Sequence, residues 1–253
     1  MSIYIRLLMA YPPVLFISVF NFGGITLALN HLESLKRQGI TNYRAYVSDQ
    51  ESYDVLIEKG HPVERITGSD TALTKEKTNF GTTDFNTLSY TRYKVIGELL
   101  RQNQPVWYLD IDTIVLQNLN DVYEVLKNAQ YDAVMQNDIN MLCTGCMLLF
   151  PTQNAIQLID AVYGNRTSRE NDQIILAHIL RNTPQQYAIF ALNMWHFPNG
   201  LLYFKELDKN PRYRELQEQF KQSTRPVYFV HANWMVGVEN KINALKEKGL
   251  WYI

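Results

Sequence analysis

Short apolar runs alternate with stretches of helical periodicity through the first half of the chain. Residues 14–20 are rich in β-branched and aromatic side chains, which favours a strand, and residues 25–38 place apolar side chains at helical spacing before Gly39. The same alternation predicts strands at residues 43–48, 62–66 and 106–109 and helices at residues 52–59 and 88–102. This order predicts an α/β fold whose mainly parallel central sheet is flanked by helices on both faces.

The second half of the chain continues this alternation less regularly. It predicts helices at residues 121–128, 154–163, 170–180 and 244–248 and strands at residues 131–135, 148–150 and 226–231. The sequence holds no internal repeat and no low-complexity tract, so one continuous domain over residues 1–253 is the better interpretation.

Two further segments bear on location and on access to a site. Residues 3–20 are apolar, but Arg6 and Pro12-Pro13 interrupt them, so the run predicts neither a transmembrane segment nor a signal peptide. Because the chain also has only two cysteines, we expect a protein of the reducing cytoplasm. The polar stretch 67–86, rich in Thr and Gly, predicts either a lid over a substrate or a surface loop.

Composition narrows the classes of function. The chain has 253 residues and a formal net charge of −1, so it can bury a sizeable core and lacks the positive charge typical of nucleic-acid binding. Cys143 and Cys146 have the spacing of a redox or zinc pair, but no second cysteine pair exists and the nearest histidine is His178. We therefore expect two small buried residues at these positions.

The apolar run 106–109 leads directly into Asp110 and Asp112, which are separated only by Ile111. Carboxylates at the end of a buried strand are costly to desolvate unless a cation or a strong hydrogen-bond donor meets them. Mn²⁺ or Mg²⁺ suits such oxygen ligands, whereas a helix cap or a turn is the structural alternative. The two side chains share a face only if the strand stays extended through them.

A histidine, His231, also ends an apolar run, and Gly237 and Lys241 follow it. A neutral imidazole could complete a metal site with two carboxylates, although a lone histidine is more often structural. Gly237 permits close approach of the backbone to a ligand, and Lys241 could meet a phosphate as a point charge. The alternative for Lys241 is a solvated lysine on a helix surface.

Two other groups of residues have both a functional and a structural interpretation. Asn171-Asp172-Gln173 lies in the first turn of a predicted helix, where local sequence favours capping and a favourable interaction with the helix dipole. The aromatic residues at 195–197 and 203–204 could line a groove for a carbohydrate ligand or could belong to the core.

Taken together and in this order, these motifs resemble those of nucleotide-diphospho-sugar transferases of the GT-A fold. The resemblance rests on residues 106–112, 142–151, 171–173 and 231–241 and extends over nearly the whole chain. It is closest to the retaining enzymes of glycosyltransferase family 77 and more distant to the glycogenin-like family 8. It implies a single Rossmann-like domain in which about residues 1–118 bind the nucleotide and about residues 119–253 shape the acceptor site.

The resemblance implies roles for particular residues. Asp110, Asp112 and His231 would hold Mn²⁺ or Mg²⁺ against the donor diphosphate, and Lys241 with the backbone of Gly237 would contact its phosphates. The residues that it places near the nucleotide or the donor sugar are Asn21, Phe22, Asp49, Lys94, Ile111, Gly145 and Trp234.

Two polar residues are assigned to the reacting centre by the same resemblance. Asp172 and Gln173 would lie beneath the donor sugar near its anomeric carbon. Cys143-Thr144 stands where relatives often have Asn or Ala, which leaves the identity of the donor sugar open.

The sequence thus predicts a metal-dependent hexosyl- or pentosyltransferase. Its donor would be a nucleoside-diphosphate sugar, most simply a UDP-sugar, and its acceptor a hydroxyl of a glycan or glycoprotein, with retention at the anomeric carbon. We expect no nucleic-acid partner and a possible homodimer. The alternatives are a phosphatase with an aspartyl nucleophile, since such enzymes also begin with a strand and two spaced aspartates, and an inactive sugar-binding protein that has kept the fold.

Overall fold

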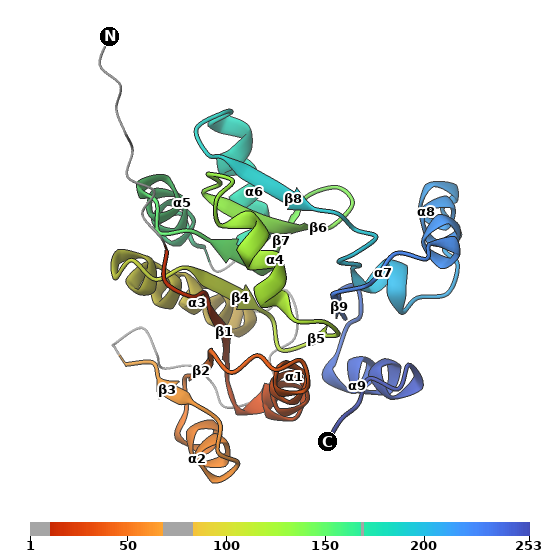
Figure 1. Ribbon diagram of the computed structural model, residues 1–253, viewed down its shortest axis with the longest axis horizontal. Coiled ribbons are helices and arrows are strands. Elements are labelled where there is room, and N and C mark those ends of the chain that lie inside the picture. The colour runs from red at the N-terminus through yellow and green to blue at the C-terminus, as the bar shows by residue number, and fades with distance from the viewer. Residues whose placement is uncertain (1–10, 68–82, 168–169) are drawn as a thin grey trace.

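A computed structural model of the protein describes residues 11–67, 83–167 and 170–253. The apolar residues 3–10 and most of the predicted lid at 67–86 lie outside the described residues. Seven strands form one sheet in the order β3-β2-β1-β4-β7-β6-β8 (Figure 1). Their bounds are Leu15–Phe20 (β1), Tyr43–Val47 (β2), Val63–Arg65 (β3), Val106–Leu109 (β4), Ala133–Asn137 (β6), Leu142–Leu149 (β7) and Ile189–Leu192 (β8).

The sheet is mainly parallel, as the alternation of strands and helices predicts. β1 pairs in parallel with β2 and with β4. β2 pairs in parallel with β3, and β6 pairs in parallel with β8. Only β7 runs against its neighbours β4 and β6. Because β7 lies between β4 of the first half and β6 of the second half, strands from both halves share one sheet, and β1, β4 and β6 end at the same edge.

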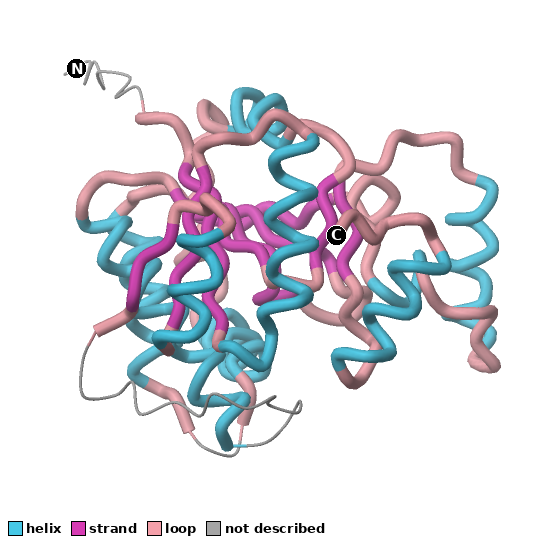
Figure 2. The backbone as a smooth tube through the Cα atoms, turned by 90° about the horizontal axis from the view of Figure 1, so that it is seen from below, coloured by secondary structure: helices cyan, strands magenta, loops and turns pink. Residues whose placement is uncertain are grey.

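Helices cover both faces of this sheet, and Figure 2 shows the strands gathered in the middle of the molecule with helices outside them. Side chains of one face pack with α1 (Ile25–Arg37), α2 (Gln50–Glu58) and α4 (Leu119–Leu126). Side chains of the other face pack with α3 (Thr83–Arg101), α5 (Gln153–Gly164) and α6 (Asp172–Asn182). The alternation of side chains along each strand divides the apolar residues between these two cores.

A second, two-stranded sheet lies beside the first and is central to the site. It pairs β5 (Thr113–Val115) with β9 (Phe229–His231) in antiparallel register, with Thr113 opposite His231. Leu27 of α1, Ile114 of β5, Val230 of β9 and Leu245 of α9 (Val238–Glu247) form a third apolar cluster that fixes this sheet. The pairing brings the residue after Asp112 against the end of the strand that carries His231.

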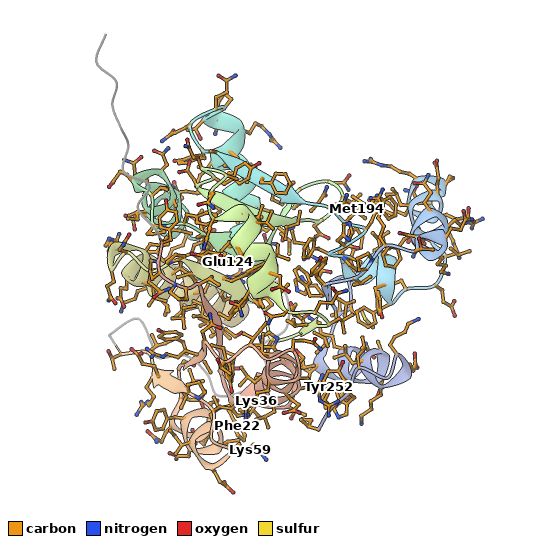
Figure 3. The ribbon with its side chains drawn as sticks, viewed as in Figure 1. Phe22, Lys36, Lys59, Glu124, Met194 and Tyr252 are labelled. Carbon is orange, nitrogen blue, oxygen red and sulfur yellow. The ribbon has the colours of Figure 1, made fainter. Side chains whose placement is uncertain are left out.

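The last residues of the chain pack against α1. Asn30 donates to the carbonyl of Leu250 (3.0 Å) and accepts from the backbone N–H of Tyr252 (2.6 Å). The guanidinium of Arg37 lies over the Tyr252 ring at 4.2 Å, and Figure 3 shows Tyr252 near α1. These contacts hold α9 and the second sheet close to the first half of the fold.

Most predicted elements are confirmed within one to three residues, and the misses have physical reasons. The sequence predicts only a short strand at residues 148–150, but the strand there, β7, begins at Leu142 and is buried over almost its whole length. β8 escapes detection because it is largely exposed. Helices α7 (Gly200–Tyr203) and α8 (Pro211–Gln222) were also missed, since α7 is a single turn and α8 buries only Gln217.

In the described residues, no helix combines the length and the apolar character that a membrane crossing needs.

Candidate active site

A cavity of about 540 Å³ opens at the edge of the sheet where β1, β4 and β6 end. In open α/β sheets this edge is where ligands bind. The predicted site residues that line the cavity are Asn21, Asp110, Ile111, Asp112, Gly145, Asp172, Gln173, His231, Trp234, Gly237 and Lys241. The fold therefore brings together eleven residues that lie between positions 21 and 241 of the sequence.

The two aspartates lie in a turn and not in a continuing strand. β4 ends at Leu109, and the N–H of Thr113 donates to the carbonyl of Asp110 at 3.0 Å. The N–H of Asp110 itself donates to the carbonyl of Gly145 in β7 at 2.8 Å. The extended geometry considered from the sequence is thus wrong at this point, since the chain turns here to pass from the main sheet into the small one.

Three atoms nevertheless converge in the cavity. The Nε2 atom of His231 lies 3.7 Å from Oδ2 of Asp110 and 3.2 Å from Oδ1 of Asp112. The other oxygen of each carboxylate is already engaged: Oδ1 of Asp110 accepts from the Tyr108 hydroxyl (2.6 Å), and Oδ2 of Asp112 pairs with Nζ of Lys241 (2.6 Å). One oxygen of each carboxylate is therefore directed at the histidine. We call Asp110, Asp112 and His231 the carboxylate–imidazole cluster.

The charges in the cluster are strongly coupled. Burial alone would raise the pKa of Asp112, but the ammonium of Lys241 and then His231 outweigh it and lower that pKa well below its usual range. Burial would lower the pKa of His231, but Asp112 outweighs it and raises that pKa well above 6.5. The Asp112 carboxylate thus lies between the ammonium of Lys241 and the imidazole of His231 inside the protein.

The donor set fits a divalent cation. The ligand atoms of the cluster all lie within 4.8 Å of one another, and two carboxylate oxygens with an imidazole nitrogen suit Mn²⁺ or Mg²⁺. Gly145 leaves the space for them: a Cβ at this position would lie 2.4 Å from Oδ2 of Asp110 and 2.5 Å from Cε1 of His231. Only glycine lets β7 approach the cluster this closely.

Arg92 of α3 joins the cluster to Asp172, and sequence reasoning missed it. Its side chain is 6% exposed, and it donates to Oδ1 of Asp110 (2.9 Å) and to Oδ2 of Asp172 (2.6 Å). The hydroxyl of Tyr93 also donates to Oδ2 of Asp172, at 2.7 Å. Burial would lower the pKa of Arg92, but Asp172 and then Tyr108 and Asp110 raise it well above its usual range. One arginine within an ordinary helical pattern gives no local signal of this role.

Asp138, directly after β6, is a second residue that was missed. It lines the cavity and accepts hydrogen bonds from Nε1 of Trp234 (2.6 Å) and Nδ2 of Asn199 (2.7 Å). The Nε2 atom of Gln173 lies 3.5 Å from its other oxygen. Trp234 has a φ of +62°, a left-handed conformation that its bond to Asp138 helps to hold. An acidic residue three positions after the predicted strand 131–135 was the available signal.

Three predicted donor-binding residues lie away from the cavity wall. Asp49 caps α2 by accepting from the N–H of Ser52 (2.8 Å), and its other oxygen accepts from the N–H of Phe22 (2.9 Å). Phe22 is 40% exposed in the short turn that precedes α1, and Figure 3 labels it. Lys94 donates to the carbonyl of Thr67 (3.1 Å). Their contact with a nucleotide stays a prediction.

The aromatic residues considered for an acceptor groove do not line the cavity. Trp195 stacks on Phe220 of α8, and Phe197 is buried and stacks on Tyr228. Their place in an acceptor groove stays a prediction, and the aromatic residues that the fold places at the cavity are Phe20, Tyr108 and Trp234. The expectation for the cysteines is confirmed, since Cys143 and Cys146 are both free and buried.

The fold and the site together define an α/β protein with an ion-paired cavity at the edge of the sheet where β1, β4 and β6 end. Residues 38–245 match the family model described as nucleotide-diphospho-sugar transferase. This match covers most of the chain, and the protein belongs to that family.

Curated relatives carry sugar-transferase names. The chain is 24% identical over 201 residues to the Arabidopsis thaliana UDP-D-xylose:L-fucose alpha-1,3-D-xylosyltransferase MGP4, a match that covers 69% of this chain and 52% of that protein. It is 23% identical over 280 residues to the Dictyostelium discoideum UDP-galactose:fucoside alpha-3-galactosyltransferase, covering 92% of this chain and 42% of that one. The chain thus spans about half the length of the curated relatives it matches.

Solved structures share the fold. The galactosyltransferase LgtC in complex with donor and acceptor sugar analogues matches with a TM-score of 0.59 and 13% identity, over 94% of this chain and 96% of that one. The apo form of mouse xyloside xylosyltransferase 1 matches with a TM-score of 0.54 and 13% identity, over 87% and 97%. The expected GT-A fold is confirmed.

Proposed function

We propose that this protein transfers a sugar from a UDP-sugar to a hydroxyl group of a glycan or glycoprotein, with retention at the anomeric carbon. The observation that carries the proposal is the convergence of the carboxylate–imidazole cluster and Lys241 in one cavity of a nucleotide-diphospho-sugar transferase fold. The division of the chain into a nucleotide-binding half, about residues 1–118, and an acceptor-shaping half, about residues 119–253, is part of the same proposal.

The cluster would hold Mn²⁺ or Mg²⁺ through Oδ2 of Asp110, Oδ1 of Asp112 and Nε2 of His231. Such an ion supplies positive charge to a diphosphate leaving group. The ammonium of Lys241 is paired with Asp112 at 2.6 Å and lies in the cavity beside the cluster. When an ion takes over the Asp112 carboxylate, that ammonium becomes free to bind a phosphate.

The donor would extend from the cluster along the cavity wall in two directions. Asn21 and Ile111 on the β1 side form the proposed nucleotide end, and Gly237 offers its backbone near the phosphates. Asp172 and Gln173 on the first turn of α6 form the proposed sugar end. In this proposal the donor reaches three further residues only if it extends beyond the residues that line the cavity. These are Phe22, Asp49 and Lys94.

Asp172 is held for an electrostatic role. Its Oδ2 atom accepts from Arg92 and from the Tyr93 hydroxyl, so the carboxylate is fixed in a single orientation at the cavity. A fixed negative charge near the anomeric carbon would stabilise the positive charge that develops there when the sugar leaves the diphosphate. We therefore assign Asp172 to stabilising or orienting the sugar, with Gln173 beside it.

The first substrates to test come from the names of the relatives. UDP-xylose and UDP-galactose are the donors in those names, and fucose or a fucoside is the acceptor. The cytoplasmic location and the homodimer expected from the sequence stay predictions.

The experiment that tests the proposal is a panel of nucleotide sugars with and without Mn²⁺, on the wild type and on Asp112→Asn. We expect one UDP-sugar to raise the melting temperature of the wild type only with metal, and to be transferred to a fucoside. The anomeric configuration of the product, read by NMR, tests retention.

A matched control is Asp132→Asn, because Asp132 is also buried and bonds Thr152 (2.6 Å) and the N–H of Ala188 (2.8 Å) away from the cavity. Asp132→Asn should keep the metal-dependent response, and Asp112→Asn should lose it. Cleavage of phosphomonoesters without any response to nucleotide sugars would replace the proposal with the phosphatase alternative. No response to either would favour the inactive sugar-binding protein.

A further inference from the structure

Gln136 of β6 is fully buried and lies against the Nδ1 side of the His231 ring. Its Oε1 atom lies 2.8 Å from Nδ1 of His231, on the side of the imidazole ring away from Asp110 and Asp112. Its Nε2 atom donates to two backbone carbonyls, those of Phe197 at 3.2 Å and Pro198 at 3.1 Å. Every polar atom of this amide is therefore engaged.

These contacts fix which way the amide points. An amide has one acceptor oxygen and one donor nitrogen, and the two backbone carbonyls beside it can only accept. The orientation that places Nε2 against the carbonyls of Phe197 and Pro198 satisfies all of them, whereas the flipped one would bring three oxygens together. Oε1 must therefore face His231.

The fixed amide in turn fixes the imidazole. Because Oε1 of Gln136 can only accept, Nδ1 of His231 must carry a proton. In the neutral ring the lone pair then lies on Nε2, the nitrogen directed at the two carboxylates. The Sγ atom of Cys143 lies 3.8 Å from the same Nδ1 and is a weaker partner than the amide oxygen.

We propose that Gln136 is a positioning residue that presents Nε2 of His231 to a divalent cation. This inference rests on the proposed function, since it concerns the metal of that site. Partners that orient a metal-bound histidine through its other nitrogen govern affinity, and their loss weakens metal binding about 10- to 100-fold. Gln136 orients His231 from inside the core, through a hydrogen bond that is present without an ion.

The fold contains a matched control. Gln217 of α8 is equally buried, and its Nε2 donates to the carbonyls of Leu201 (2.8 Å) and Glu206 (2.9 Å) while its Oε1 accepts from the N–H of Asp208 (2.7 Å). Gln217 thus loses the same kind of buried bonds when it is replaced, but it does not contact His231.

The experiment compares Mn²⁺ binding to the wild type, Gln136→Met and Gln217→Met by isothermal titration calorimetry, with urea unfolding of each. We expect both substitutions to reduce stability, and Gln136→Met alone to raise the Kd for Mn²⁺ about 10- to 100-fold. Equal Kd values for the wild type and Gln136→Met would overturn the inference. Failure of the wild type to bind Mn²⁺ would instead overturn the metal site of the proposed function.

A second measurement does not depend on the variant folding. Long-range ¹H–¹⁵N correlation spectra of the Mg²⁺-loaded wild type report which nitrogen of His231 carries the proton. We expect the proton on Nδ1. A proton on Nε2, with Nδ1 free, would contradict the role assigned to Gln136 whatever the Kd values are.

Discussion

The guanidinium of Arg92 lies 2.6 Å from the carboxylate of Asp172, and both side chains are almost completely buried. Arg92 also reaches Asp110 at 2.9 Å, so a single cation joins the carboxylate–imidazole cluster to the first turn of α6. Removing one member of a buried pair leaves the other charge without compensation, which costs far more than the loss of an exposed pair.

We expect Arg92→Met to lower the free energy of unfolding by about 3–5 kcal/mol, because Asp172 and Asp110 lose their shared cation. Urea unfolding measures this loss. The double variant Arg92→Met/Asp172→Asn should lose less free energy of unfolding than the two single variants lose together, since it carries one uncompensated charge fewer.

The control for Arg92 is on the same helix. Arg101 pairs with Asp160, and both side chains are about half exposed, at 50% and 52%. Arg101→Met should therefore cost less than about 1 kcal/mol. Similar losses for Arg92→Met and Arg101→Met would show that the buried pairing adds nothing.

Gly145→Ala should abolish or strongly weaken metal binding while the protein stays folded. The added methyl would lie 2.4 Å from Oδ2 of Asp110 and 2.5 Å from Cε1 of His231, closer than either atom allows, so these two ligands must move away from it. A rise in the Kd for Mn²⁺ of at least about 10-fold is expected. Gly164→Ala is the control, because nothing lies within 4 Å of a Cβ at that position. Unchanged Mn²⁺ affinity in Gly145→Ala would place the ion elsewhere.

Lys241→Met should change metal and nucleotide affinity in opposite directions. The substitution removes the ammonium that competes with a metal ion for the Asp112 carboxylate, so Mn²⁺ alone should bind more tightly. UDP in the presence of Mn²⁺ should bind about 10-fold more weakly, because a hydrogen bond from a charged donor is lost. Calorimetry measures both, and Lys246→Met on the same helix should change neither. Unaltered UDP binding in Lys241→Met would remove Lys241 from the phosphate site.

His31 makes folding stability fall in acid. It is fully buried on α1, its Nδ1 lies 2.6 Å from the carbonyl of Thr113, and burial lowers its pKa from 6.5 to about 4. Between pH 6.5 and about 4, this histidine binds a proton in the unfolded chain but not in the folded protein. The free energy of unfolding therefore decreases as the pH falls through this window.

The size of this effect follows from the two pKa values, and a variant isolates it. A lowering from 6.5 to about 4 corresponds to about 3 kcal/mol. When the pH is lowered from 6.5 to 4, the free energy of unfolding should fall in both proteins. The fall should be about 3 kcal/mol larger in the wild type than in His31→Asn. Parallel pH profiles for the two proteins would mean that His31 is protonated in the fold.

Local patterns in the sequence determined the type and order of most elements. Apolar runs and helical spacing depend on neighbours in the chain, so β1, α1 and β4 can be predicted from them. They also located Asp110, Asp112 and His231, because a polar side chain at the end of a buried run stands out against its local background. α8 has no such contrast, since its one buried residue is polar.

The tertiary structure alone decided which of these side chains meet. β5 and β9 pair although more than 100 residues separate them, and this pairing sets the distance from Asp112 to His231. Arg92 and Gln136 have no local signal, because each gains its role from burial against residues distant in sequence. Burial removes water as a competing partner, and it is a property of the packed fold and not of any short segment.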